Sequence, residues 1–177
     1  MKLYIVRHGQ TDWNLEGRVQ GQADIPLNDT GINQAENLKE KLRSYDLDIC
    51  YCSPLKRAVQ TAEIAIDGRM QIIFDDDLKE RSYGDLEGID TRDWNVDEFD
   101  RKLNTSEGGM EPINSLLARS KKVLERIKAE NPDDAKVLIV GHETFFKTLH
   151  YNIVGYDDST NFLDFRLENG GIAEYDI

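Results

Sequence analysis

The sequence has few cysteines, few prolines and no long apolar run. It has two cysteines and four prolines in 177 residues, and no apolar run approaches the roughly 20 residues of a membrane span. The first apolar stretch, residues 2–6, meets Arg7 and His8 too early to be the core of a signal peptide. Cys50 and Cys52 lie two residues apart on an expected strand, a spacing that favours buried thiols over a redox or metal-binding pair. We therefore expect a cytoplasmic protein without a membrane partner.

Basic residues are also scarce. The chain has 22 Lys and Arg against 34 Asp and Glu, which gives a formal net charge of −12. Nucleic acids and anionic membranes require a basic surface, so this charge argues against both as partners. If the ligand is an anion, the few basic side chains must converge at one place. The length suits one compact domain over residues 1–177, as a monomer or a homodimer.

Apolar runs alternate with helical periodicities, which predicts an α/β fold: a three-layer α/β/α sandwich with a mostly parallel central sheet. Parallel strands are expected at residues 2–6, 48–52, 71–74 and 136–140. Helices are expected from near Thr30, from Ser53-Pro54 (N-cap and first helical residue), over residues 113–127 and over residues 145–153. Residues 162–167 and 172–176, which flank a glycine pair, predict a closing hairpin.

Polar clusters follow three of the expected parallel strands. They are Arg7-His8-Gly9, Ser53-Pro54 with Arg57, and Gly141-His142-Glu143. Because parallel strands deliver their carboxyl ends to one edge of a sheet, the three clusters are expected to meet there. Each residue alone has an ordinary interpretation, such as a loop histidine or a solvated arginine. Their convergence instead predicts an anion site, to which the amino end of the helix after Ser53-Pro54 adds oriented N–H groups.

The residue types at this edge suit phosphoryl transfer. A neutral histidine is a nucleophile toward phosphorus, and arginine presents a planar fork that matches phosphate oxygens. Catalysis of such a reaction consists mainly of positioning and charge neutralisation. The leaving alkoxide needs a proton, and Glu80, just after the third expected strand, is placed to supply it.

Four ordered motifs carry a family resemblance. Residues 3–14, which contain Arg7-His8-Gly9, closely resemble the signature of the histidine phosphatase superfamily, the phosphoglycerate-mutase-like fold. Residues 53–62 resemble its second motif, residues 78–84 with 86–88 its third, and Gly141-His142 its fourth. The matches span nearly the whole chain, although residues 90–109 and the last 25 or so residues match only loosely.

The resemblance implies a role for each matching position. His8 is the nucleophile that becomes phosphorylated, with its other ring nitrogen donating to a backbone carbonyl, and Glu80 is the proton donor. The phosphoryl oxygens are held by Arg7, Arg57 and His142, with Asn14 as a further contact and Thr11, Gln20 and Gly21 nearby. The resemblance implies that the protein needs no metal and no cofactor. It also implies that the protein's partner is a small-molecule phosphate ester.

One position departs from the family pattern. Glu143 follows His142, where many relatives carry glycine or another small or neutral residue. A carboxylate this close to a phosphate site repels the ligand if it points inward. We therefore expect Glu143 to point away from the site or to pair with a basic group.

The residues after the third motif distinguish the possible activities. The mutases of this superfamily carry a long basic insertion here, whereas residues 85–100 hold seven acidic residues against one base, Arg92. An acidic lid, at about residues 85–110, is a poor clamp for a bisphosphate, which favours hydrolysis by a metal-independent phosphatase. A phosphoglycerate mutase, or a catalytically weak phosphate-ester-binding or interaction protein, remains an alternative. A two-histidine metal site lacks a carboxylate at ligand spacing apart from Glu143. Trp94 and Phe99 form either a wall over the leaving group or an anchor for the lid.

Overall fold

The computed structural model describes residues 1–93 and 104–177, and its framework is one sheet of five strands. The strands are β1 (Lys2–Arg7), β2 (Ile49–Cys52), β3 (Ile72–Phe74), β4 (Lys136–Gly141) and β5 (Ile172–Asp176). They lie in the order β3-β2-β4-β1-β5, and only β5 runs antiparallel to its neighbour. The mostly parallel sheet predicted from the sequence is thus confirmed.

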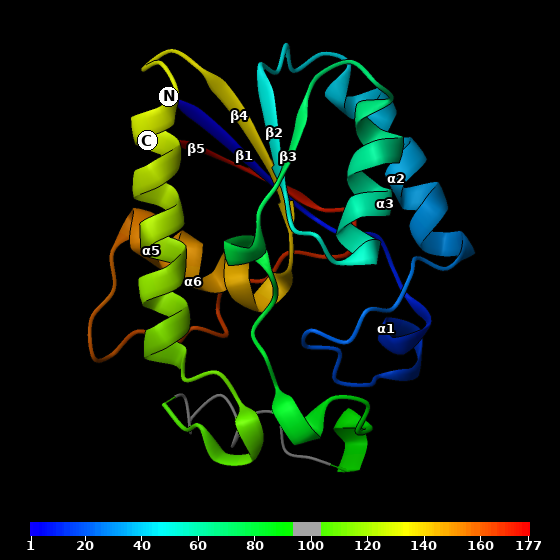
Figure 1. Ribbon diagram of the computed structural model, residues 1–177, viewed down its shortest axis with the longest axis vertical. Coiled ribbons are helices and arrows are strands. Elements are labelled where there is room, and N and C mark those ends of the chain that lie inside the picture. Colours follow the sequence, from blue (N-terminus) through cyan, green and yellow to red (C-terminus); the bar gives the residue numbers. More distant parts are fainter. Residues whose placement is uncertain (94–103) are drawn as a thin grey trace.

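Helices cover both faces of the sheet, so the fold has three layers (Figure 1). One face carries α2 (Asp29–Leu42) and α3 (Lys56–Ile66), and the other carries α5 (Ile113–Glu130) and α6 (Glu143–Val154). The short helix α1 (Asp12–Glu16) and four 3₁₀ turns complete the described part: η1 (Asp76–Leu78), η2 (Gly84–Leu86), η3 (Thr91–Asp93) and η4 (Glu107–Gly109). Among the described residues, no helix combines the length and apolarity needed to cross a membrane.

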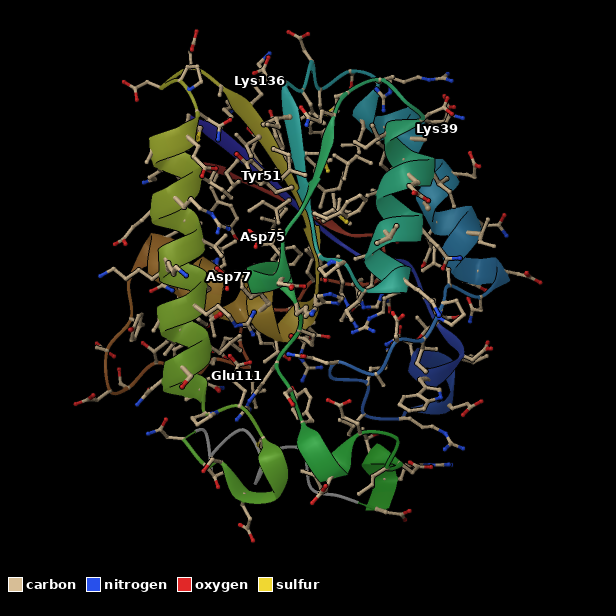
Figure 2. The ribbon with its side chains drawn as sticks, in the orientation of Figure 1. Lys39, Tyr51, Asp75, Asp77, Glu111 and Lys136 are labelled. Atoms are coloured by element: carbon tan, nitrogen blue, oxygen red, sulfur yellow. The ribbon has the colours of Figure 1, made fainter. Side chains whose placement is uncertain are left out.

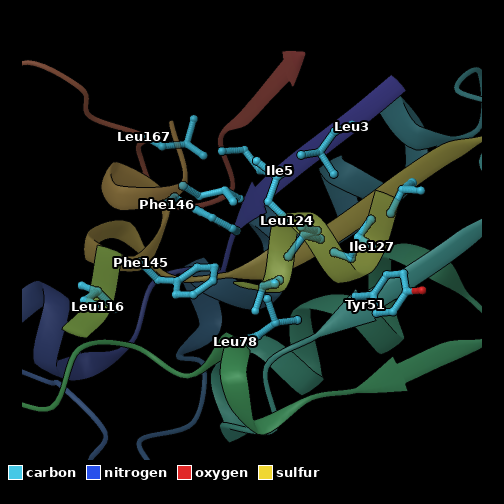
Figure 3. Close-up of a cluster of buried hydrophobic side chains, with 14 of the residues drawn as sticks. Leu3, Ile5, Tyr51, Leu78, Leu116, Leu124, Ile127, Phe145, Phe146 and Leu167 are labelled. Atoms are coloured by element: carbon cyan, nitrogen blue, oxygen red, sulfur yellow. The ribbon is translucent and has the colours of Figure 1, made fainter. Parts of the chain in front are cut away.

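The alternation of side chains along the strands creates two hydrophobic cores. Leu3 and Ile5 point to the face covered by α5 and α6, where Phe145 and Phe146 pack against them (Figure 3). Tyr4 and Val6 point to the opposite face, under α2 and α3. A fully buried leucine or isoleucine contributes roughly 1.5–3 kcal/mol. The two cores therefore fix which way each strand faces, and with it the residues that leave each strand end.

Both cysteines lie in the core under α2 and α3. Cys50 and Cys52 are fully buried and free of disulfides, as their spacing predicts. Burial raises the pKa of Cys50 to about 12 and also raises that of Cys52. The thiols are therefore unreactive packing groups in the folded protein.

Two predictions about local structure are wrong. The chain forms β5, but residues 162–167 form turns and irregular structure, so there is no hairpin. Instead, Phe162 packs on Tyr151 and Phe165 stacks on His150, both on α6. This packing outweighs strand pairing. Helix α3 also begins later than predicted, because its N-cap is Leu55 rather than a serine.

Candidate active site

A cavity of about 190 Å³ opens at the carboxyl edge of the sheet, between the ends of β1 and β4. Its walls are formed by Arg7, His8, Asn14, Arg18, Val19, Gln20, Gly21, Arg57, Glu80, Tyr83, Thr91, Glu143, Thr144 and Lys147. The structure thus brings together eight of the nine site residues proposed from the sequence. Seven of them line the cavity, and the eighth, His142, lies against His8. The exception is Thr11, which is fully buried and does not line the cavity.

His8 and His142 meet because their strands are neighbours. Arg7 and Gly141 are paired in the parallel register of β1 and β4, so each histidine is the next residue along its strand. The backbone N–H of His8 donates to the carbonyl of Gly141 at 3.0 Å, and the two imidazole centroids lie 5.2 Å apart. Both rings are buried at the same edge of the sheet.

The hydrogen bonds of His8 fix its protonation. Its Nδ1 lies 2.7 Å from the carbonyl oxygen of Gly9, which can only accept, so Nδ1 carries the proton. Nε2 accepts a hydrogen bond from Nε of Arg57 at 3.3 Å. Burial, followed by the charges of Arg57 and Arg7, holds the pKa of His8 well below its ordinary value. The ring is therefore neutral, with its Nε2 lone pair unprotonated.

Arg57 is held rigidly inside the wall. Its side chain is 1% exposed, and its Nη1 and Nη2 donate to the carbonyls of Ala23 and Gly21, each at 2.7 Å. Burial lowers the pKa of Arg57 to about 10, which leaves it cationic at neutral pH. At the amino end of the helix that carries it, the N–H of Lys56 donates to Asp24 at 2.7 Å and is not available to a ligand.

Arg7 is held by a different set of partners. Its Nη1 donates to the carbonyl of Leu167 at 2.8 Å and lies 2.7 Å from Oε2 of Glu143. Its Nε is buried and has no hydrogen-bond partner in the described part of the chain. A buried N–H donor beside a cavity is available to an anionic ligand, and an unmet donor of this kind is costly without one.

His142 is oriented by Ser53. The hydroxyl of Ser53 lies 2.7 Å from Nε2 of His142, and it also accepts a longer bond from the N–H of Leu55 at 3.4 Å. Nδ1 of His142 is buried and has no partner among the described residues. Burial, with a further contribution from Arg57, holds the pKa of His142 well below its ordinary value. If Ser53 donates to Nε2, the neutral ring presents an N–H at Nδ1.

Glu80 lies at the amino end of α6. Its Oε1 accepts the N–H groups of Arg81 at 2.8 Å and Phe145 at 2.9 Å, and its Oε2 accepts that of Thr144 at 3.0 Å. The side chain therefore caps the helix, whose first N–H groups have no partner inside the helix. Oε1 is saturated by two donors, whereas Oε2 retains a free lone pair.

A charged network on α5 fixes the segment that leads to Glu80. Arg119 donates to the carbonyls of Asp77 and Lys79 at 2.8 and 2.7 Å, and it binds both carboxylate oxygens of Glu111. About two turns further along α5, Arg126 pairs with Asp75 and Asp77. These acidic side chains and Glu111 lie along α5 in Figure 2.

Asn14 is positioned by a capping box at the start of α1. Thr11 is the N-cap, and its Oγ1 accepts the Asn14 N–H while its own backbone N–H donates to Oδ1 of Asn14. Asn169 also donates to this Oδ1, at 3.3 Å. Thr11 therefore positions Asn14 from behind the cavity wall. Gln20 lines the cavity and has a buried Oε1 without a partner among the described residues.

Glu143 does pair with basic groups, as expected. Its Oε2 contacts Arg7, and its Oε1 lies 3.4 Å from Nζ of Lys147, one turn further along α6. Sequence reasoning did not anticipate that its partner would be an arginine of the anion site itself. Lys147 was also missed, although the i, i+4 spacing from Glu143 was a signal that could have found it.

Part of the proposed lid contacts the rim of the cavity. Gly88 N–H donates to Val19, and Thr91 donates to Gly17 through both its N–H and its hydroxyl, each at 2.8 Å. Trp94 and Phe99 lie outside the described residues. Within residues 1–93 and 104–177, no group of three His, Cys, Asp or Glu is arranged to hold a metal ion.

The fold and the cavity define an α/β protein with a buried, neutral histidine in a cavity lined by arginine and lysine side chains. A family model for the histidine phosphatase superfamily (branch 1) matches residues 3–177, and the chain belongs to this family. It is 38% identical to the uncharacterized phosphatase PhoE of Bacillus subtilis over 96% of this chain and 88% of that one. It is 34% identical to a 2,3-bisphosphoglycerate-dependent phosphoglycerate mutase of Cytophaga hutchinsonii, over 83% and 74% of the two chains.

A solved structure shows the same architecture. The phosphoserine phosphatase of Entamoeba histolytica, in complex with 3-phosphoglyceric acid, superposes with a TM-score of 0.82 at 29% identity. The match covers 98% of this chain and 89% of that one. A phosphatase thus shares this fold, and a mutase is among the sequence relatives of this chain.

Proposed function

We propose that the protein is a metal-independent phosphomonoester hydrolase that works through a phosphohistidine intermediate on His8. The observation that carries the proposal is the geometry of this ring. Its Nδ1 is fixed by Gly9, and its unprotonated Nε2 lies beside Arg57 in the wall of the cavity. A neutral imidazole held in this way is ready to attack phosphorus.

In the first step, Nε2 of His8 attacks phosphorus and the bond from phosphorus to the ester oxygen breaks. Arg7, Arg57, Asn14 and Nδ1 of His142 neutralise and position the phosphoryl oxygens. Arg7, Arg57 and Asn14 line the cavity, and Nδ1 of His142, whose ring lies 5.2 Å from that of His8, has no partner among the described residues. The guanidinium groups supply the charge stabilisation that a metal ion provides in other phosphoryl-transfer enzymes.

Glu80 is the proposed proton donor to the leaving oxygen. Oε2 is the atom that fits this role, because Oε1 already accepts two N–H groups. In the second step a water attacks phospho-His8 and passes a proton to the Glu80 carboxylate. The phosphorus–nitrogen bond then breaks, and inorganic phosphate leaves with His8 and Glu80 restored.

Hydrolysis is preferred over mutase activity because acidic residues follow the third motif in the sequence and because the cavity wall contains Glu143. A mutase must retain a second phosphate, yet the segment from residue 85 to residue 100 is acidic and Glu143 adds a carboxylate to the cavity. Acidic residues of this kind repel a bisphosphate. Similarity to the Cytophaga mutase makes mutase activity the alternative to test. Interconversion of 2- and 3-phosphoglycerate by the protein, with added bisphosphate, would contradict the preference for hydrolysis.

The central test uses p-nitrophenyl phosphate without added metal. The wild type is expected to hydrolyse it, and His8→Ala is expected to be inactive. An acid-labile, base-stable phosphoryl label is expected on the wild type and absent from the variant. His150→Ala is a matched control, since this histidine lies in an aromatic cluster on α6 and does not line the cavity. Turnover by His8→Ala would refute the assignment of the nucleophile.

A further inference from the structure

The cavity contains a carboxylate that the proposed hydrolysis does not use. Glu143 is the first residue of α6, and it bridges Arg7 and Lys147. All three side chains are largely withdrawn from solvent, at 26% exposed for Glu143, 12% for Arg7 and 11% for Lys147. The charges therefore interact inside the wall, where solvent screens them only in part.

A bound phosphate competes with Glu143 for the same guanidinium. Nη1 of Arg7 already donates to Leu167 and contacts Oε2 of Glu143. A phosphoryl group that binds Arg7 brings its oxygens close to this carboxylate, and the two like charges repel each other. A cation on the open side of Glu143 relieves the repulsion.

In the proposed mechanism, the leaving group faces the part of the cavity wall that the phosphoryl contacts leave open, and Glu143 belongs to that part. In-line displacement places the leaving oxygen on the far side of phosphorus from Nε2 of His8. The walls beyond the proposed phosphoryl contacts are formed by Arg18, Tyr83, Thr91, Glu143, Thr144 and Lys147. Arg18 is already paired with Glu16 at 2.6 Å, and the hydroxyls of Tyr83 and Thr144 bond to each other at 2.9 Å.

The two acidic residues of the cavity wall differ in what they can offer a leaving group. Glu80 accepts three backbone N–H groups, so its position is fixed by the backbone of α6 and its own segment. Among the described residues, the side chain of Glu143 is paired only with Arg7 and Lys147. The longer of these contacts, to Lys147 at 3.4 Å, is the more easily exchanged. Another ammonium group can take that place.

We propose that Glu143 selects substrates by charge, favouring phosphate monoesters of amino alcohols over esters that carry a hydroxyl group at the same position. The ammonium group of such an ester lies two carbons from the ester oxygen, within reach of a carboxylate that already touches the phosphoryl-binding Arg7. This inference rests on the proposed function and names the substrate class of the same site.

The test compares substrates that differ only in an ammonium group replacing a hydroxyl group. O-phosphoethanolamine is paired with 2-hydroxyethyl phosphate, and O-phosphoserine with 3-phosphoglycerate. In the wild type we expect kcat/KM to be about fivefold or more higher for the ammonium member of each pair, the size typical of a partly exposed charge pair. In Glu143→Gln the ratio is expected to fall to about one. Taking the ratio within one variant cancels any general loss of activity.

Two further variants sharpen the comparison. Lys147→Gln removes the ammonium group that competes for Glu143, so the ratio is expected to rise above that of the wild type. Glu125→Gln on α5 removes an exposed charge that does not line the cavity, and the ratio is expected to stay at the wild-type value. A ratio near one in the wild type, or the same preference in Glu143→Gln, would overturn the inference.

The outcome for the proposed function is read separately. Hydrolysis of p-nitrophenyl phosphate that depends on His8, with no ammonium preference, refutes the inference and leaves the function standing. If no ester is hydrolysed, the proposed hydrolase function is refuted. Calorimetric binding of the same two substrate pairs to the wild type and to Glu143→Gln then still tests whether Glu143 selects ligands by charge. Tighter binding of the ammonium members by the wild type alone supports charge selection, and equal binding overturns it.

Discussion

Nε of Arg57 lies 3.3 Å from Nε2 of His8, so the guanidinium group is packed against the ring nitrogen that is proposed to attack phosphorus. Such a pairing requires a neutral imidazole, because two cations at this distance repel each other. The same guanidinium is fixed by two carbonyls of the loop that follows α1. Arg57 therefore ties the protonation state of the nucleophile to the shape of the cavity wall.

Arg57→Lys should separate binding geometry from charge. A lysine cannot donate to Gly21, Ala23 and His8 together, so kcat/KM is expected to fall by ~100-fold. The free energy of unfolding is expected to fall by about 1–3 kcal/mol because buried carbonyls lose their donors. Arg69→Lys is the matched control, since Arg69 likewise makes three hydrogen bonds, all to backbone carbonyls, and does not line the cavity. It should lose stability, measured by urea unfolding, without losing rate.

The buried histidines make stability depend on pH. Burial lowers the pKa of His8 and His142 in the folded state, so below about pH 6.5 the unfolded chain binds protons that the folded protein does not. The free energy of unfolding should therefore fall as the pH is lowered, by up to ~1.4 kcal/mol per pH unit for each histidine. This loss of stability is absent above the pKa of histidine in the unfolded chain, and it appears as the pH falls through that pKa.

Urea unfolding of the wild type and His142→Asn between pH 7.5 and 5, in phosphate-free buffer, measures this dependence. The variant should lose less stability on acidification than the wild type, because one proton-linked group is removed. The carboxylates act alike in both proteins and cancel in the difference. Parallel curves for the two proteins would show that His142 is protonated in the folded state.

Ser53→Ala tests the positioning of His142. Losing the hydroxyl leaves Nε2 of His142 buried without a partner, and the ring is no longer held with its proton at Nδ1. We expect kcat/KM to fall by about tenfold to 100-fold and inhibition by inorganic phosphate to weaken. Ser120→Ala on α5 also deletes a buried serine hydroxyl, remote from the cavity. Equal rate losses in the two variants would indicate a structural role alone.

Glu80→Gln tests the proton donor through the leaving group. p-Nitrophenolate leaves without help, whereas an alkoxide needs a proton. The variant should therefore lose ~100-fold or more in kcat/KM toward an alkyl phosphate and much less toward p-nitrophenyl phosphate. Equal losses on both substrates would mean that Glu80 serves only to cap α6 through the N–H groups of Thr144 and Phe145.

The strand ends were predictable from sequence because the apolar runs are clear and parallel strands share an edge. This reasoning brought Arg7, His8 and His142 together, and the structure places them so. The groups that hold them were not predictable. Ser53 is 89 residues from His142, and Leu167 is 160 residues from Arg7, so these contacts depend on the completed fold.

Local patterns misled where tertiary packing was stronger. The alternation in residues 162–167 resembles a strand, yet Phe162 and Phe165 are occupied by ring contacts with α6. Helix α1 was missed because it spans only five residues and its capping box uses Asn14 where glutamate or glutamine is usual. Glu80 was proposed from the sequence and lines the cavity, but no sequence signal indicated that three N–H groups converge on it.

The two buried cysteines offer a direct measurement of how the protein opens. Cys50 and Cys52 are covered by α2 and α3, so a thiol reagent reaches them only when that layer separates from the sheet. The rate of alkylation of the unmodified chain therefore reports the free energy of this opening. A phosphate analogue that binds at the distant edge and slows the alkylation would show that the cavity and the helical layer open as one cooperative unit.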